Sequence, residues 1–283
     1  MKIINPPNRT TLQCVLKNQA FTLIELLAVT AVMIVLAGVF VPALANSRAS
    51  SDLTVCQDHL RRIGHAFSLY SADNREELCP TGGLDVLVSS ASPTKSYPAL
   101  LQQWCMGDMG AAPGWTNSTL IRDSLLFPYV NSLAAYHCPS DPSSISRGSL
   151  RTVPSNGNPR IRSLAANCFI NPINPWSEGR SYRKQGDLIL GPANTWVAIE
   201  ENPASINDGW LVHPPLGSTS IFWVDYPASF HREAGSLVFD DDHVETRHWT
   251  DRSMIDYGGA GQGPPTPKSD DHRWLSERTT VLH

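Results

Sequence analysis

The sequence predicts an α+β fold in which one long N-terminal helix packs on a mainly antiparallel sheet and long loops join the elements. Three observations predict this fold. Residues 21–41 are almost entirely apolar, residues 53–70 repeat apolar side chains at helical spacing, and the chain after Asp187 contains β-rich runs bounded by turn residues. Twenty-two prolines and nineteen glycines among 283 residues add the expectation of a loop-rich domain.

Residues 21–45 form the first predicted element, a transmembrane and assembly helix. Its apolar run, residues 21–41, would be about 31 Å long as a helix, which matches the hydrocarbon core of a bilayer. Lys2, Arg9 and Lys17 precede it and no acidic residue does, so we expect a cytoplasmic N-terminus and a C-terminal part outside the cell membrane. The alternative is a cleaved secretory signal. Ala43-Leu44-Ala45 resembles its cleavage site, but the apolar run is longer than a normal signal core.

Glu25 is the one charged residue in this apolar run. An ionised carboxylate at membrane depth costs about 2.5 to 3.5 kcal/mol on insertion scales and usually marks a function. The simpler interpretation is that Glu25 reaches the lipid headgroups. The sequence at this stage supports both interpretations.

Residues 46–75 are predicted to continue the helix as an amphipathic segment that ends near Arg75. Pro42 should kink the helix without ending it, because the helical pattern resumes afterwards. The apolar positions recur at steps of three and four and form one stripe, which we expect to dock on the sheet. This stripe consists of Leu53, Cys56, Leu60, Ile63, Phe67 and Tyr70.

Residues 76–283 are predicted to form a globular domain. Its first part, to about Pro159, is rich in Gly, Pro and Ser and indicates loops with short helices. A Gly/Pro-rich linker and a short polar helix over residues 270–278 are expected at the C-terminal end. The sheet is predicted from the β-rich runs Asp187–Leu190, Thr195–Glu200, Ser220–Val224, Gly235–Phe239 and Val244–Trp249.

Charge and cysteine content narrow the class of protein. The formal net charge of −4 indicates a mildly acidic surface. Nucleic-acid-binding proteins usually have a basic stripe, so we expect no nucleic-acid partner. One of the six cysteines, Cys14, lies in the basic N-terminal segment, which leaves an odd number in the remainder of the chain. At most two disulfides can then form in an oxidising compartment, with one thiol left over. No pair has C-x-x-C spacing, which argues against zinc or redox chemistry.

The segment Ala20-Phe21-Thr22-Leu23-Ile24-Glu25-Leu26-Leu27, behind its short basic leader, resembles the N-terminal signal of type IV prepilins and type II secretion pseudopilins. The resemblance implies that a prepilin peptidase removes residues 1–20, cutting between Ala20 and Phe21 and methylating the new amino terminus. It also implies that Glu25 pairs with the terminal amine of a neighbouring subunit, which would explain a buried charge. The family normally has Gly at the position of Ala20.

Two further segments extend the resemblance to a large group of bacterial pseudopilin-like proteins. They are Cys56 to Gly64 with the following Tyr70 and residues 73–75, and Tyr136 to Pro142. In the C-terminal half of that group a His is followed after nine residues by Asp-Gly in a hairpin. Here His231, nine residues and Asp241 fit, but Asp242 replaces the glycine and His243 follows. A turn that needs positive φ favours Gly or Asn over Asp.

Several carboxylates near the C-terminal end are candidate metal ligands. Hard oxygen ligands are what calcium takes, and some major pseudopilins of type II secretion bind calcium in a C-terminal loop. The sequence contains no EF-hand spacing, and acidic loop tips are commonly plain turn formers. A softer metal such as zinc at His231 with His243 is a second interpretation. The candidate calcium ligands are Glu200, Asp208, Asp240, Asp241 and Asp242.

An enzyme is not expected. Ser229, His231 and Asp225 contain the residue types of a hydrolase triad within a few positions. They lack a nucleophile elbow and an oxyanion loop, and a triad is defined by geometry. A hydrogen bond from His231 to the loop around Asp208 is the expected structural role.

These observations predict a structural subunit of a type II secretion pseudopilus or a pilus-like fibre. It would be a single-pass inner-membrane protein with a periplasmic C-terminal domain and no cofactor, calcium excepted. Its partners would be the prepilin peptidase, other pilin or pseudopilin subunits, the inner-membrane assembly machinery and membrane lipid. The alternative function is a membrane-tethered extracytoplasmic domain that binds calcium or a glycan and does not polymerise.

Overall fold

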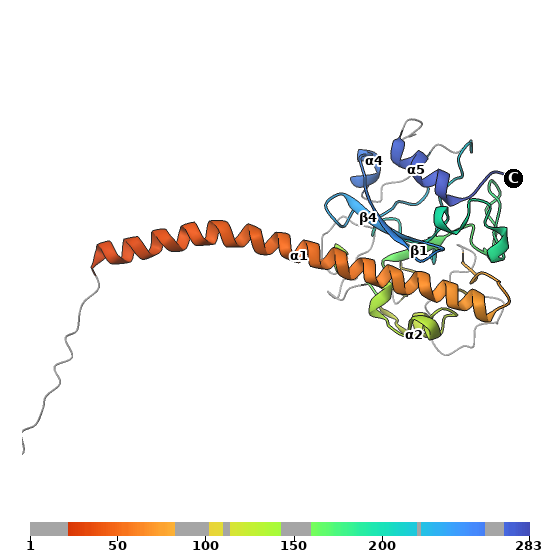
Figure 1. Cartoon of the computed structure of the whole chain (residues 1–283), viewed down its shortest axis with the longest axis horizontal. Helices are drawn as coiled ribbons and strands as arrows, with labels where there is room; N and C mark the ends of the chain where they lie inside the picture. Colours follow the sequence, from red (N-terminus) through yellow and green to blue (C-terminus); the bar gives the residue numbers. More distant parts are fainter. Residues whose placement is uncertain (1–21, 83–101, 110–113, 143–159, 220–221, 258–268) are drawn as a thin grey trace, which may run out of the picture. The chain divides into compact units, whose positions relative to one another are not determined.

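A computed structural model describes residues 22–82, 102–109, 114–142, 160–219, 222–257 and 269–283. The chain divides into two compact units, Met1–Ser47 and Arg48–His283, and we call the second the C-terminal unit. Figure 1 shows the elements along the chain. The α-helices and strands are α1 Leu23–Asp73, α2 Thr119–Arg122, α3 Phe127–Val130, β1 Leu164–Asn167, β2 Trp196–Glu200, β3 Trp210–Leu211, β4 Ala234–Phe239, β5 Val244–His248, α4 Arg252–Ile255 and α5 Asp270–Thr279. The 3₁₀ helices are η3 Gly114–Thr116, η4 Ala134–Tyr136, η6 Gln185–Asp187 and η7 Pro192–Asn194.

Helix α1 begins in the apolar run and continues through Pro42 into the amphipathic segment. Within the described residues, Leu23–Val41 is the one helical segment long and apolar enough to cross a membrane, and its side chains are exposed. The helix ends where Arg75 and Glu76 take positive φ angles of 58° and 66°, because left-handed residues cannot continue a right-handed helix. The single apolar helix is compatible with a single-pass membrane protein.

The sheet has five strands in the order β3-β1-β2-β4-β5. The pairs β1·β2, β2·β4 and β4·β5 are antiparallel, and β1·β3 is parallel. The β2·β4 register shifts between Trp196 and Ala198, which is the mark of a β-bulge. The predicted α+β class and mainly antiparallel sheet are therefore confirmed.

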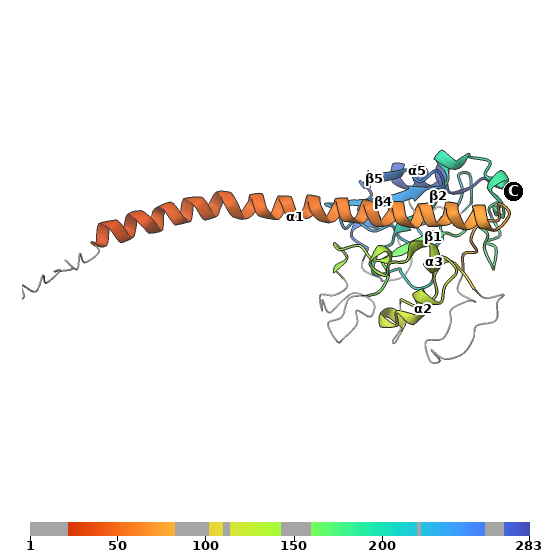
Figure 2. The same cartoon turned by 60° about the horizontal axis from the view of Figure 1, so that its bottom comes forward.

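Both faces of the sheet are covered within the C-terminal unit. On one face, Leu164, Ala166, Ala198 and Val238 share a core with α1, and on the other face Ala165, Ile199 and Leu237 pack with residues of α4 and α5. In Figures 1 and 2 the C-terminal part of α1 lies between α2 and the strand β4. The expected docking of the amphipathic stripe on the sheet is confirmed.

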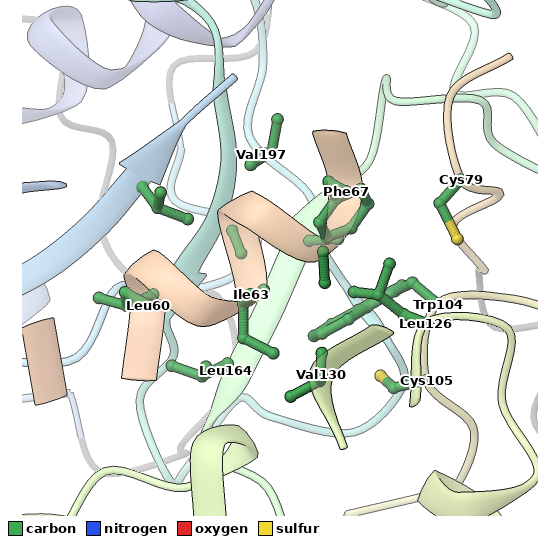
Figure 3. Close-up of a cluster of buried hydrophobic side chains, with 14 of the residues drawn as sticks. Leu60, Ile63, Phe67, Cys79, Trp104, Cys105, Leu126, Val130, Leu164 and Val197 are labelled. Atoms are coloured by element: carbon green, nitrogen blue, oxygen red, sulfur yellow. The ribbon is translucent and has the colours of Figure 1, made fainter. Parts of the chain in front are cut away.

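The core around α1 is built from the stripe and two neighbouring layers. Figure 3 shows Leu60, Ile63 and Phe67 of α1 among side chains from the strands and from the loops. The Phe67 and Trp104 ring centroids lie 5.9 Å apart, and both residues are buried. The loop that contains Trp104 therefore packs on the side of α1 that the sheet does not cover.

Two of the five predicted strands are not observed among the described residues, and two of the observed strands were not predicted. Asp187–Leu190 is not a strand, because the Asp187 carboxylate accepts hydrogen bonds from the backbone N–H groups of Arg183 and Lys184 and closes the η6 turn. Ser220 lies outside the described residues, and residues 222–224 form no strand. Strands β1 and β3 supply the remaining two positions in the sheet.

Candidate functional site

Thr22 and Glu25 cap the N-terminus of α1. Glu25 Oε2 accepts hydrogen bonds from Thr22 N and Thr22 Oγ1, each at 2.8 Å, and Glu25 N donates to Thr22 Oγ1 at 3.3 Å. This reciprocal pattern is a capping box, which satisfies the free N–H groups of a helix N-terminus. Glu25 therefore has a partner within its own chain. The predicted processing residues Ala20 and Phe21 lie outside the described residues.

The five carboxylates predicted as calcium ligands do not form one site. Asp208 Oδ1 accepts from Trp210 N at 3.1 Å, Asp240 accepts from Gln185 Nε2, and Glu200 lies with two thiols and an imidazole. Asp241 and Asp242 belong to the β4–β5 turn. Asp240, Asp241 and Asp242 adjoin one another in the chain, but Glu200 and Asp208 contact other groups, so the five carboxylates do not converge.

The β4–β5 turn explains the Asp that replaces Gly in the predicted hairpin motif. Asp242 has a φ of 69°, the left-handed region that favours Gly or Asn. Its Oδ1 accepts a hydrogen bond from Ser68 Oγ at 2.9 Å, and its Oδ2 lies 3.1 Å from His65 Nδ1. The turn therefore adopts positive φ although Asp242 stands in place of the glycine, and the Asp242 carboxylate ties it to α1. His243 Nδ1 lies 2.5 Å from Asp241 Oδ1 at the exposed tip.

The hydrolase triad is not assembled, and His231 does not bind the Asp208 loop. Asp225 Oδ2 accepts from Val212 N at 2.7 Å, while His231 Nε2 lies 3.1 Å from Glu200 Oε1. The expected hydrogen-bonding role of His231 was thus assigned to the wrong partner. His231 and His243 also belong to different sites, because His243 stacks on Phe239 and contacts Asp241.

Four side chains from distant parts of the chain form one buried cluster, which we call the thiol–imidazole cluster. Cys56 comes from α1, Cys138 follows η4, Glu200 ends β2, and His231 precedes β4. Their ligand atoms all lie within 4.8 Å of one another. Among the described residues this is the one group of three or more His, Cys, Asp or Glu side chains placed to hold a metal ion.

The β-bulge in β2 places Trp196 and Glu200 on opposite faces of the sheet. Side chains alternate between the two faces of a regular strand, yet Val197 and Ala198 both pack in the α1 core, whereas Trp196 and Ile199 pack on the other face. The extra residue shifts the alternation by one, so Glu200 falls on the α1 face. There Cys56 Sγ donates to Glu200 Oε1 at 2.8 Å.

The cluster stabilises charge on two of its members. Burial raises the pKa of Glu200, but the hydrogen bond from His231 and its charge outweigh burial and hold the pKa below its usual value. Burial disfavours the charged form of His231, yet its contacts with Cys138 and Glu200 raise the pKa of His231 to about 10. Contact with Cys138 and then burial raise the pKa of the Cys56 thiol. The chain alone therefore holds an imidazolium–carboxylate pair beside protonated Cys56.

A second group of buried acids lies near the end of β2. Burial raises the pKa of Asp208 to about 7 and of Asp225 to about 8, and it raises the pKa of Glu201 well above its usual value. The Arg162 guanidinium donates to the carbonyls of Leu164 and Asp208. The Arg162 guanidinium thereby holds the loops around these acids together.

Searches against protein-family models, curated proteins and solved structures find no significant match. The functional conclusions therefore rest on residues and their geometry.

Sequence reasoning named two members of the thiol–imidazole cluster with the wrong partners and treated the other two as candidates for disulfides. Cys56 and Glu200 are 144 positions apart, and Cys138 and His231 are 93 positions apart. All five cysteines of the described part, Cys56 and Cys138 included, are buried free thiols. C-x-x-C spacing could not have found this group. The segments around Cys56 and Cys138 that carried the pseudopilin-like resemblance were the available signal.

Proposed function

We propose that the chain is a pilin-like subunit that is anchored in the inner membrane by α1, processed by a prepilin peptidase and assembled into a fibre. The observation that carries this proposal is the surface of Leu23–Val41, where every side chain is exposed. The same helix then supplies Leu60, Ile63 and Phe67 to the core of the C-terminal unit. An apolar helix continuous with a packed domain suits both lipid and packing against identical helices.

Glu25 is the residue on which the proposed contact between neighbouring subunits depends. The carboxylate lies in the first turn of the helix, where the positive end of the helix dipole and the capping box with Thr22 stabilise it. Removal of residues 1–20 would create a positive amine next to Thr22 on every subunit. The amine of a neighbouring subunit would then supply the opposite charge that a carboxylate inside a bundle of apolar helices needs.

Two substitutions separate the charge of Glu25 from its cap. Gln at the third helical position keeps the capping box without charge, so Glu25→Gln tests the ion pair alone. Thr22→Val breaks the cap and keeps the charge. We expect Glu25→Gln to insert in the membrane like the wild type and to be absent from cross-linked multimers, and Thr22→Val to multimerise.

The mature amino terminus tests the processing step. Mass spectrometry of protein from the native cell should find an N-terminal, methylated Phe21. An intact Met1, or a chain starting at Asn46 after signal cleavage, would contradict the proposal. Membrane fractionation followed by in-cell cross-linking supplies the assembly measurement.

A non-polymerising membrane tether is the second candidate function. The observation that favours it is the capping box, because Thr22 already supplies local hydrogen bonds to the Glu25 carboxylate. Glu25 would then need no neighbour. If Glu25→Gln and Glu25→Ala both leave the cross-linking pattern unchanged, the tether is the better description and the fibre proposal fails.

A further inference from the structure

We propose that Cys56, Cys138, Glu200 and His231 bind one zinc ion that joins α1 to the sheet. The four side chains come from four separate segments and converge in the interior. Cys56, Cys138 and Glu200 have no exposed surface, and the His231 side chain is 3% exposed. Two thiols, an imidazole and a carboxylate together form a donor set for a tetrahedral zinc site.

The distances fit such a site. Zinc bonds of about 2.3 Å to sulfur and about 2.0 Å to nitrogen or oxygen place tetrahedral ligand atoms about 3.3 to 3.8 Å apart. Cys138 Sγ lies 3.4 Å from His231 Nε2, and His231 Nε2 lies 3.1 Å from Glu200 Oε1. The Cys56 Sγ to Glu200 Oε1 distance is shorter, 2.8 Å, because the thiol donates a hydrogen bond. Zinc binding would release the protons of the two thiols and the Nε2 proton of His231 to solvent, and a movement of less than about 1 Å completes the tetrahedron.

Neighbouring groups hold the ligands in position. Ser236 N donates to Glu200 Oε2 at 2.6 Å, which leaves Oε1 directed at the other three donors. Cys138 N donates to Ser163 Oγ at 2.6 Å and fixes the backbone of that ligand. Hydrogen bonds of this kind orient metal ligands and raise affinity in known sites.

The donor set selects the metal and the type of site. Thiolates and imidazole favour zinc over calcium and magnesium, which take oxygen ligands. Four protein ligands complete a tetrahedron and leave no position for water or substrate, so the site would be structural. It would fasten Cys56 of α1 to three segments of the C-terminal unit.

A disulfide between Cys56 and Cys138 is the competing chemistry, since an oxidising compartment favours it. It would involve two of the four converging atoms, whereas a metal ion engages all four. The two chemistries differ in metal content and in thiol reactivity, and both can be measured on one sample.

The test uses the full chain purified in detergent without chelator or reductant. Zinc per chain is measured by plasma mass spectrometry for the wild type, Cys56→Ser, Cys138→Ser and the control Cys168→Ser. Cys168 is an equally buried thiol in a different cluster, with Phe169, Trp210 and Val212. We expect about one zinc ion per chain in the wild type and the control, and, in titration against a zinc chelator, at least a tenfold weaker zinc affinity in the two ligand variants.

Cobalt substitution keeps the test independent of variant folding. Cobalt(II) added to chelator-treated, reduced wild-type chain should produce sulfur-to-metal charge transfer and the visible bands of a tetrahedral complex. Absence of both zinc and these bands would overturn the proposal. So would a Cys56–Cys138 disulfide found by alkylation and peptide mapping, or zinc retained at wild-type affinity by folded Cys56→Ser.

Discussion

Replacement of Gly64 by alanine tests how closely α1 approaches the sheet. Gly64 lies on the buried side of the helix, beside Ile63. A Cβ added at this position would lie 2.5 Å from Val238 Cγ2 of β4 and 3.4 Å from Asp242 Oδ1. Val238 is fully buried and belongs to the same core, so it has little space to move.

Two opposing terms set the size of the effect. Alanine in place of glycine inside a helix gains about 1 kcal/mol. Carbon atoms pack at about 3.5 to 4.0 Å, so the contact would be at least about 1 Å too short. Overpacking of a core costs about 1 to 3 kcal/mol, and we take the upper value because the overlap is large. The expected net loss for Gly64→Ala is about 2 kcal/mol in the free energy of unfolding.

Urea unfolding of the full chain in detergent, followed by tryptophan fluorescence, measures this loss. Gly186→Ala is the matched control, because a Cβ there meets no atom within 4 Å, and its stability should change by less than about 0.5 kcal/mol. Val238→Ala should rescue Gly64→Ala, so that the double variant is about 3 kcal/mol more stable than the sum of the single effects, the full overpacking cost. A Gly64→Ala chain as stable as Gly186→Ala would refute the close packing of helix and sheet.

Three further predictions concern charged side chains. Asp242→Ala should lower the free energy of unfolding by about 2 kcal/mol, since it loses the hydrogen bond from Ser68 and places alanine at a positive φ that Asp tolerates better. Asp242→Asn, which tolerates that φ, should change it by less than about 0.5 kcal/mol in the same thermal or urea measurement. Burial raises the pKa of Asp208 to about 7, so the folded state binds more protons than the unfolded state between about pH 4 and pH 7. The stability contributed by protonated Asp208 is complete below that window and falls by about 1.4 kcal/mol per pH unit through it. The raised pKa values of Asp225 and Glu201 add slopes of the same sign, so Asp208→Asn should lessen the measured slope by about 1.4 kcal/mol per pH unit, and an unchanged slope in urea unfolding would contradict the assignment. Burial opposes the charge on Asp271, but backbone N–H groups outweigh it and hold the pKa below its usual value. Asp271→Ala should cost about 3 kcal/mol at neutral pH, and the difference should shrink as acid protonates the wild-type carboxylate.

Long periodic segments were predictable from the sequence. The stripe that contains Cys56 and Ile63 repeats over several helical turns, and the observed helix buries both residues. Strands β2, β4 and β5 follow β-branched runs and lie within about two residues of the predicted limits. Strand β1 was missed because Leu164–Asn167 is short and buried on both faces, which removes the alternation that identifies a strand.

The thiol–imidazole cluster could not be predicted because its geometry depends on tertiary contacts. Glu200 and His231 were recognised as unusual polar residues, but their common partner is the cysteine pair of α1 and the η4 turn. Trp196 and Glu200 lie on opposite faces only because of a bulge, and that bulge forms only when β2 pairs with β4. Local propensity contains no information about that pairing.

The bulge makes the cluster independent of one residue of chain length. Deletion of Val197 would restore regular β2·β4 pairing and leave the remaining side chains on their present faces, because Trp196 already pairs with Phe239 and Ala198 with Val238. Glu200 would stay on the face that packs on α1, beside Ser236 of β4. A relative that carries both cysteines, the glutamate and the histidine could therefore share the cluster with one residue fewer in this strand.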